Sequence, residues 1–327
     1  MSDTPLLELR HLTTHYVSAR GTRVVPAVDD VSFGLDAGQT LGIVGESGSG
    51  KTTLALTILR LLSPAARIVR GEVLFEGEDL LKKTAGEMRR IRGKRIAMIL
   101  QDPMASLNPL FTVGDQVAEP IRVHEGVGRG AAWTRARDLL KAVKISAPET
   151  RLKEYPHQMS GGMRQRIVGA IAISCGPRLL IADEPTTSLD VTIQAQYLNL
   201  LRELQRAHGL AMIFITHNLG IVAKMCGHVA VMYAGRIIEQ GPVRRIFRSP
   251  AHPYTCALIE SIPRLGDNHQ RLTAIDGQPP DLAALPGGCP FHPRCPKAME
   301  RCRAEDPPAF EVEARHSARC WLVAPGG

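Results

Sequence analysis

The chain has 327 residues, of which 44% are hydrophobic and 22% charged, and its formal net charge is +8. This length and composition suffice for one large globular domain and a smaller one. No apolar run reaches the roughly 18 residues of a membrane span, and "MSDTPLLELR" lacks the pattern of a signal peptide, so we expect a cytoplasmic protein. The densest basic cluster, Met88–Arg95, has no interleaved aromatic residues for base stacking, and we therefore expect no nucleic-acid partner.

A short apolar segment, Leu41–Val44, precedes a glycine-rich loop and an apolar pattern at helical spacing, which predicts a strand, a loop and a helix. Gly45, Gly50, Lys51 and Thr52 match G-x-x-x-x-G-K-[ST], in which backbone N–H groups surround phosphate oxygens at a helix N-terminus. Lys51 is expected to reach the β- and γ-phosphates, and Thr52 to supply a hydroxyl ligand for Mg²⁺. The expected phosphate-loop residues are Gly45, Ser47, Gly48, Ser49, Gly50, Lys51, Thr52 and Thr53.

Two further apolar segments, "RLLIADEP" and "AMIFITH", are predicted to be strands that end in polar residues. Parallel strands present their carboxyl ends to the ligand, so we expect Asp183 to help hold Mg²⁺ and Glu184 to orient or deprotonate the attacking water. His217 ends the other strand, where its imidazole could hydrogen-bond the γ-phosphate or the water. An acidic pair after a strand is often only a helix N-cap, and a lone histidine there is usually structural, but the phosphate loop favours a functional acidic pair.

The segment "HQMSGGMRQRI" decides between the many classes of phosphate-loop protein. It resembles the signature motif of the ATP-binding-cassette family, and the family's other motifs follow in the family's order from Tyr16 to His217. The resemblance implies an α/β fold: a P-loop NTPase nucleotide-binding domain with a RecA-like core, an antiparallel β subdomain and a helical subdomain. We place the helical subdomain at about residues 102–170.

The resemblance also assigns roles to further residues. It implies that Tyr16 stacks on adenine, that Gln101 senses the γ-phosphate, binds Mg²⁺ and contacts the membrane partner, and that Asp190 lies in a loop at the dimer interface. It further implies a site for the γ-phosphate held by the other subunit, formed by Ser160, Gly161 and Gly162. A serine hydroxyl and glycine N–H groups at a helix N-terminus can form such an anion site.

The signature departs from its commonest form at Met159 and Met163, where leucine and glutamine are usual, but it retains the serine and both glycines. Because the family completes each ATP site from two subunits, we expect this chain to dimerise, with a copy of itself or a related chain, in order to hydrolyse ATP. The pattern "WTRARDLLKAVKI" predicts an amphipathic helix, and the resemblance implies that this region touches the membrane subunits.

The segments "QDPMASLNPL" and "HPYTCALIESIP" resemble the ATPase subunits of oligopeptide, dipeptide and nickel importers. This implies ATP hydrolysis that energises peptide import, with nickel or another small solute as the alternative. The implied partners are a second ATPase subunit, two membrane-spanning permease subunits and an external solute-binding protein, which place the chain on the cytoplasmic face of the membrane. A soluble cassette ATPase acting on nucleic acid or ribosomes is a distant alternative, because such proteins generally carry two cassettes or a long coiled-coil insertion.

A change in composition divides the chain into a nucleotide-binding domain, residues 1–262, and a small Cys- and Pro-rich extension, residues 263–327. Four thiols in a cytosolic segment too small for its own core suggest a metal site, although unligated thiols are an alternative. The chemistry allows Zn²⁺ or an iron–sulfur cluster. Some members of the importer subgroup carry a 4Fe-4S cluster in this region, so the resemblance favours that cluster. The expected ligands are Cys289, Cys295, Cys302 and Cys320.

The other cysteines and the histidines of the extension are expected to be structural. Cys175, Cys226 and Cys256 lie among apolar residues and are predicted to be small core side chains. His292 and His316 could replace a cysteine ligand but are expected at the surface. We expect the extension to be a separate, loop-rich appendage that becomes disordered when metal is lost, while the nucleotide-binding fold remains.

Overall fold

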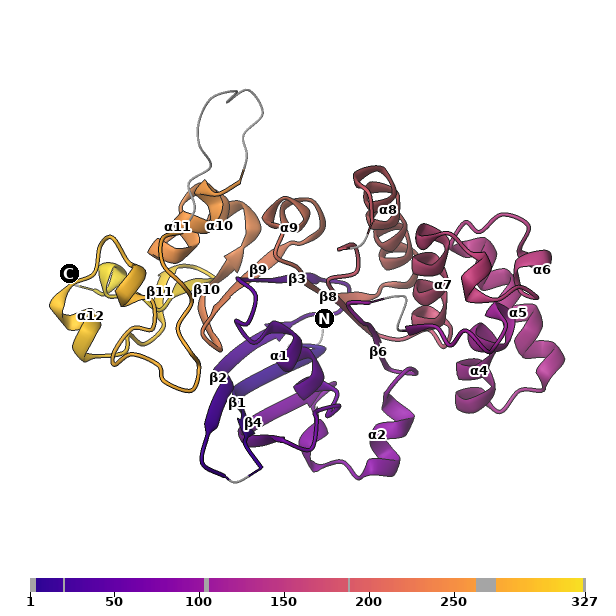
Figure 1. The fold of residues 1–327 in the computed structure, drawn as a ribbon, viewed down its shortest axis with the longest axis horizontal. Helices are drawn as coiled ribbons and strands as arrows, with labels where there is room; N and C mark the ends of the chain where they lie inside the picture. The colour runs from indigo at the N-terminus through magenta and orange to yellow at the C-terminus, as the bar shows by residue number, and fades with distance from the viewer. Residues whose placement is uncertain (1–3, 20, 103–105, 188, 263–274, 326–327) are drawn as a thin grey trace. The chain divides into compact units, whose positions relative to one another are not determined.

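The computed structural model describes residues 4–325 except residues 20, 103–105, 188 and 263–274. The chain forms two compact units, each built from separate segments (Figure 1). Unit 1 contains Met1–Leu35, Thr40–Leu81 and Ile215–Gly327, and unit 2 contains Asp36–Gln39 and Lys82–Phe214. Within the described residues, none of the helices combines the length and the apolarity needed to cross a membrane.

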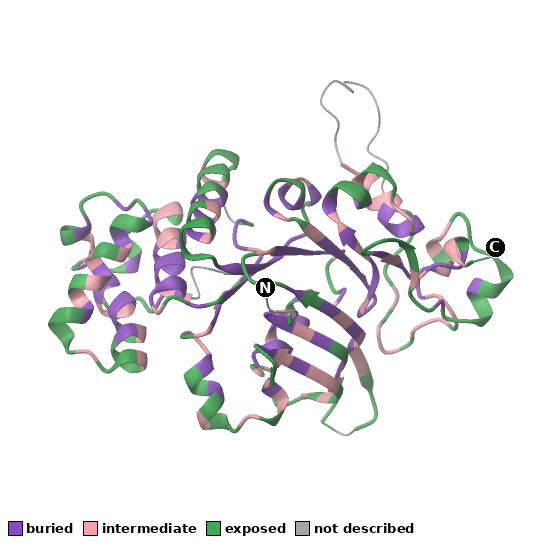
Figure 2. Cartoon of the chain, turned by 180° about the vertical axis from the view of Figure 1, so that it is seen from behind, coloured by how far each residue is buried: buried purple, intermediate pink, exposed green. Residues whose placement is uncertain are grey.

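Unit 1 contains an antiparallel sheet with the strand order β2-β1-β4-β5. In its register, Leu7 lies opposite Leu35 and Tyr16 opposite Val25. Over parts of these strands, buried positions alternate with less buried ones, as Figure 2 shows, because successive side chains of a strand point to opposite faces of the sheet. This sheet confirms the predicted antiparallel β subdomain. Its strands are β1 (Leu7–Val17), β2 (Val24–Leu35), β4 (Ala66–Phe75) and β5 (Glu78–Asp79).

A second set of strands in unit 1 follows the order β11-β12-β10-β9-β3. Strand β3 (Thr40–Val44) is buried throughout and runs parallel to β9 (His228–Tyr233), and helix α1 (Lys51–Ile58) begins shortly after β3. This confirms the strand, loop and helix predicted around the glycine-rich loop. The other helices of this region are α9 (Leu219–Met225), α10 (Val243–Arg248) and α11 (Pro253–Glu260).

The C-terminal extension adds strands to the same sheet. Strand β12 (His316–Ala318) pairs antiparallel with β10 (Arg236–Pro242), and β11 (Phe310–Glu313) pairs with β12. Phe291 belongs to the same buried core as Tyr233 and Tyr254. The structure thus differs from the expected separate appendage. Strands of the extension continue a sheet formed by the preceding segments, and Phe291 packs into the core of those segments. The predicted boundary at residue 262 adjoins residues outside the described part and stays a prediction.

His316 also differs from the expectation of a surface residue. Its side chain is 2% exposed, and its Nε2 atom lies 2.8 Å from Oε1 of the buried Glu239. The backbone N–H groups of Ala251 and His252 donate to the same Glu239 carboxylate, at 2.7 and 2.9 Å. A buried polar side chain needs such partners, so these contacts anchor β12 to β10.

Unit 2 combines parallel strands with helices. Strand β6 (Ile96–Ile99) runs parallel to β7 (Leu179–Asp183), and the strand order is β8-β7-β6, with β8 at Ala211–Ile215. Figure 1 shows helices α4 to α7 gathered together in the predicted helical subdomain. The unit's helices are α2 (Ala85–Ile91), α4 (Val113–Glu125), α5 (Arg129–Ala142), α6 (Pro148–Arg151), α7 (Gly161–Ile173) and α8 (Val191–His208).

The amphipathic helix predicted from "WTRARDLLKAVKI" is α5. Its buried residues are Ala132, Ala136 and Leu140, which recur every four positions and therefore lie on one face of the helix. Helix α4 approaches closely, because a Cβ atom on Gly114 would lie 2.5 Å from the Trp133 ring. A glycine on one helix and small alanines on the other thus allow α4 and α5 to pack tightly.

Candidate nucleotide-binding site

The phosphate loop connects the buried end of β3 to the N-terminus of α1, and two of its glycines are required by close backbone packing. A Cβ atom on Gly45 would lie 2.2 Å from the Met232 carbonyl oxygen, and one on Gly50 would lie 2.1 Å from the Ala27 carbonyl oxygen. Gly50 also has a φ of 100°, which side-chain-bearing residues rarely adopt. The loop is therefore pressed against strands β9 and β2, and its shape depends on glycine at both positions.

Lys51 is buried, and its ammonium group is bonded to the loop. Its Nζ atom donates to the carbonyl oxygens of Gly45 and Glu46, both at 2.8 Å, and to Ser49 Oγ at 3.3 Å. Thr52 is exposed in the first turn of α1, where helical N–H groups lack intrahelical partners and favour an anion. The loop thus has a backbone conformation that requires glycine, the Lys51 ammonium group, and the exposed Thr52 hydroxyl at a helix N-terminus.

Glu46 has contacts that the sequence motif does not indicate. Its backbone N–H donates to the Tyr254 hydroxyl oxygen at 2.9 Å, and its carboxylate pairs with both terminal nitrogens of Arg294, at 2.8 and 3.0 Å. Sequence reasoning missed all three residues. Glu46 occupies an unspecified position of the motif, and nothing in the spacing of "HPYTC" or "HPRCP" connects those segments to the loop.

Two other predicted site residues lie in unit 1. His217 follows β8, is exposed, and immediately precedes Asn218, whose side chain caps α9 by accepting from Gly220 N. Tyr16 is half-buried near the end of β1. The expected contacts of both residues with nucleotide stay predictions.

The acidic pair lies at the end of β7 in unit 2. Asp183 is the last residue of the strand and is 1% exposed. Glu184 has a φ of 44°, an uncommon backbone conformation for a residue with a side chain and one that is often found at functional sites. The Gln101 amide donates to Glu184 Oε2 at 3.2 Å, and the Thr187 hydroxyl donates to the same oxygen at 2.9 Å. The fold thus brings Gln101 and Glu184 together, and their expected roles toward nucleotide and water stay predictions.

The signature residues and Asp190 line one hollow in unit 2. Ser160 is the N-cap of α7, and its hydroxyl accepts from Met163 N at 3.3 Å. Asp190 is the N-cap of α8 and accepts from two backbone N–H groups of that helix. The hollow has a volume of about 330 Å³ and is lined by Ser160, Gly161, Gly162, Met163, Arg166, Leu189, Asp190 and Ile193. Two helix N-termini thus border one open hollow, whose lining mixes polar and apolar side chains.

The four cysteines of the extension also converge. They line a single cavity of about 10 Å³, together with residues that include His252, Phe291 and Trp321. Burial raises the pKa of Cys289 to about 12 and that of Cys320 to about 11, since a buried thiolate loses its hydration. No group of three or more His, Cys, Asp or Glu side chains in the described part of the chain has the arrangement of metal ligands. The donor atoms thus suit a metal, but the thiols would have to rearrange and deprotonate to hold one.

The remaining cysteines are less buried than predicted. Cys175, Cys226 and Cys256 are each half-buried. Cys226 comes closest to the predicted core position, because it packs against the buried cluster around β9.

A glycine-rich loop between a parallel strand and a helix, together with an acidic pair ending a second parallel strand, defines a P-loop nucleotide-binding fold. The model of the family described as "ABC transporter" matches residues 28–187, and that of "Oligopeptide/dipeptide transporter, C-terminal region" matches residues 238–302. Together with the relatives described next, these matches show that the chain belongs to the ABC transporter ATP-binding proteins, in the group that carries this C-terminal region.

Similar proteins cover almost the whole chain. The oligopeptide transport ATP-binding protein OppD of Haemophilus influenzae is 47% identical, over 98% of this chain and 98% of its own. The dipeptide transport ATP-binding protein DppD of Bacillus subtilis is 49% identical, over 97% of this chain and 94% of its own. Among solved structures, the ATP-binding cassette MJ0796, a dimer in a post-hydrolysis state bound to ADP and Pi, is 25% identical with a TM-score of 0.65. It covers 73% of this chain and 99% of its own.

Proposed function

We propose that this chain is the ATP-binding and ATP-hydrolysing subunit that energises an ABC importer for peptides. The observation that carries the proposal is the joint presence of an ABC transporter match and an oligopeptide/dipeptide C-terminal region in one chain. Relatives named as oligopeptide and dipeptide transport ATP-binding proteins, 47% to 49% identical over nearly the full length, support peptides as the cargo.

In this proposal the phosphate loop binds the β- and γ-phosphates through its backbone N–H groups. Lys51 exchanges part of its contact with the loop carbonyls for contact with the phosphates, whose charge it neutralises. Thr52, Gln101 and Asp183 supply oxygen atoms, the ligands that Mg²⁺ prefers. Tyr16 stacks on adenine.

Glu184 is the proposed general base. As the water oxygen attacks the γ-phosphorus, the water proton passes to the Glu184 carboxylate and ADP leaves. The two donors on Glu184 Oε2, from Gln101 and Thr187, would fix the orientation of that carboxylate before reaction. His217 is proposed to hydrogen-bond the γ-phosphate or the attacking water.

The proposed working state is a dimer of ATPase subunits, because the signature hollow of one subunit would close the ATP site of the other. Ser160, Gly161 and Gly162 would bind the γ-phosphate held by the partner, with Asp190 at the interface. The partner is a copy of this chain or a related chain. Two membrane-spanning permease subunits and an external solute-binding protein complete the proposed importer, with this chain peripheral on the cytoplasmic face of the membrane.

For the extension we propose that Cys289, Cys295, Cys302 and Cys320 bind one 4Fe-4S cluster. Their convergence on one cavity and the softness of thiolate ligands support the proposal. A bound cluster would cross-link the segments that carry the four residues. Purification without oxygen should give about four iron and four sulfide per chain with brown absorbance, whereas zinc without iron, or no metal, would refute the cluster.

Transport of a labelled peptide into proteoliposomes that contain the permease subunits tests the functional proposal. We expect uptake that requires internal MgATP and the wild-type chain, and little uptake with Glu184→Gln. Uptake of Ni²⁺ but of no peptide under the same conditions would refute peptides as the cargo.

A further inference from the structure

Arg294, in the C-terminal extension, is held against the phosphate loop. Its side chain is 5% exposed, and its two terminal nitrogens donate to the two carboxylate oxygens of Glu46, at 2.8 and 3.0 Å. Its Nε atom donates to the carbonyl oxygen of Asp276 at 2.9 Å. The hydrogen bond with Glu46 raises the pKa of Arg294 above its usual range, so the guanidinium stays charged. A bidentate pair of this kind fixes the relative orientation as well as the distance of its two partners.

Glu46 is restrained at three points. Its carbonyl oxygen accepts from Lys51 Nζ, its N–H donates to the hydroxyl oxygen of the buried Tyr254, and its carboxylate is held by Arg294. Glu46 directly follows Gly45 in the loop. Its side-chain position therefore bears on the backbone that is proposed to surround the phosphates.

The groups that hold Glu46 are themselves packed in a rigid cluster. The Tyr254 ring lies 4.6 Å from that of Tyr233 and 5.4 Å from that of Phe291, measured between ring centroids. The guanidinium of Arg294 lies over the rings of both Tyr233 and Phe291, 5.9 Å from each centroid. The rings meet in tilted and edge-to-face arrangements, and this packing restricts the movement of the guanidinium and of the Tyr254 hydroxyl.

The extension also borders the loop beside this pair. Pro279, Pro280 and Leu282 line a small cavity that is otherwise formed by the loop and the end of β9. The extension thus approaches the loop at two places, through an ion pair and through apolar side chains.

We propose that Arg294 is a positioning residue of the nucleotide site, which holds the phosphate loop in its binding conformation through Glu46. The inference rests on the proposed ATP-binding function and adds to it a role for the C-terminal extension. Without the guanidinium, the Glu46 carboxylate loses its partner and the loop samples other conformations. Part of the free energy of nucleotide binding is then used to order the loop, so the affinity for MgATP falls.

The test compares variants of the full-length chain by calorimetric titration with MgATP. We expect Arg294→Gln and Glu46→Gln each to weaken MgATP binding by about tenfold. The double variant should be no weaker than either single variant, because both changes remove one interaction. Arg294→Lys keeps the charge but not the bidentate geometry and should recover part of the affinity.

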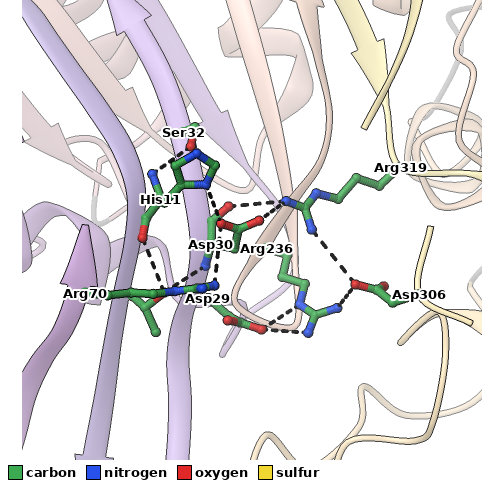
Figure 3. A network of polar contacts seen from close by, with 9 residues as sticks. His11, Asp29, Asp30, Ser32, Arg70, Arg236, Asp306 and Arg319 are labelled. Atoms are coloured by element: carbon green, nitrogen blue, oxygen red, sulfur yellow. Dashed lines mark hydrogen bonds and ion pairs between the residues drawn. The ribbon is translucent and has the colours of Figure 1, made fainter. Parts of the chain in front are cut away.

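The matched control is Arg319→Gln. Arg319 is also an extension residue paired with a carboxylate, that of Asp30 at 2.5 Å. Asp30 belongs to strand β2 and not to the phosphate loop, and the pair is part of the network in Figure 3. We expect this variant to lose thermal stability and keep its MgATP affinity. An equal loss of affinity in Arg319→Gln, or wild-type affinity in folded Arg294→Gln, would overturn the positioning role.

A second measurement separates this inference from the proposed function. Amide hydrogen exchange of residues 46–50 without nucleotide should be faster in Arg294→Gln than in the wild type, and unchanged in Arg319→Gln. Unchanged exchange in Arg294→Gln would refute the positioning role. A wild-type chain that fails to bind MgATP would instead refute the proposed function.

Discussion

The Gln101 amide and the Glu184 carboxylate are joined by a hydrogen bond of 3.2 Å, although they lie 83 positions apart in the sequence. The Thr187 hydroxyl donates to the same carboxylate oxygen. Two donors on one oxygen restrict rotation of the carboxylate. Gln101 therefore has a structural means of influencing the residue proposed to activate water.

Glu184→Gln should abolish most ATP hydrolysis while preserving MgATP binding. The amide has nearly the shape of the carboxylate but cannot accept the water proton, so we expect turnover to fall by roughly 100-fold or more. Phosphate release with the partner subunits and calorimetric MgATP binding measure the two effects, and a stable ATP-bound dimer should accumulate. Glu203→Gln, at an exposed acid paired with Lys144, is the control. Turnover near the wild-type rate in Glu184→Gln would exclude Glu184 as the base.

Lys51→Ala should weaken nucleotide binding itself. The change removes the cation proposed to face the β- and γ-phosphates, an interaction that contributes about 1.5 to 3 kcal/mol for a hydrogen bond to a charged group. This corresponds to a loss of affinity of at least about tenfold. Lys141→Ala, an exposed lysine on α5, should bind normally. Tight MgATP binding by folded Lys51→Ala would contradict the assignment of the phosphate loop.

Gly162→Asp should damage the ATP site whose phosphate loop belongs to the other subunit. It places a carboxylate in the proposed anion site, and its Cβ atom would lie 2.8 Å from the Ile193 side chain. In a homodimer, mixing this variant with Lys51→Ala produces dimers in which one site carries both changes and the other carries neither. ATP hydrolysis should therefore recover in the mixture. No recovery in dimers shown to contain both variants would rule out the cross-subunit arrangement.

Asp30 should make stability depend on pH in the acidic range. Although its burial opposes ionisation, hydrogen bonds from Arg319 and His11 lower the pKa of its carboxyl below the usual value (Figure 3). The unfolded chain then binds a proton before the folded one, so this stabilisation is present at neutral pH and is lost as the pH falls below about 4. Asp30→Asn should melt at a lower temperature than the wild type at pH 7. The difference should shrink as the pH falls below about 4, and a difference independent of pH would contradict the ion-pair explanation.

Local features of the site could be predicted because the residues that form them are close together in the sequence. The loop from Gly45 to Thr52 follows from a motif whose glycines, lysine and hydroxyl act within one strand–loop–helix segment. The position of Asp183 at the end of β7 follows from the apolar run before it. In both cases the backbone geometry of neighbouring residues determines where the functional groups lie.

Contacts between distant segments could not be predicted in this way. Arg294 and Glu46 are separated by 248 positions, and neither belongs to a pattern that pairs them. The burial of His316 depends on β12 adding to the sheet beside β10, which a proline-rich composition does not indicate. The expectation that metal loss would spare the nucleotide-binding fold treats the extension as independent. The Arg294–Glu46 pair connects the extension to the phosphate loop, so we expect a loss of metal from the extension to lower the affinity for MgATP.

The central claim is that ATP hydrolysis by this chain drives peptide import. The most direct measurement is the ATPase rate of the chain assembled with its permease subunits in liposomes, with and without peptide-loaded solute-binding protein. Our account predicts MgATP hydrolysis that rises several-fold with peptide and is lost in Glu184→Gln. A rate that is unaffected by peptide-loaded binding protein, or that persists in Glu184→Gln, would contradict it.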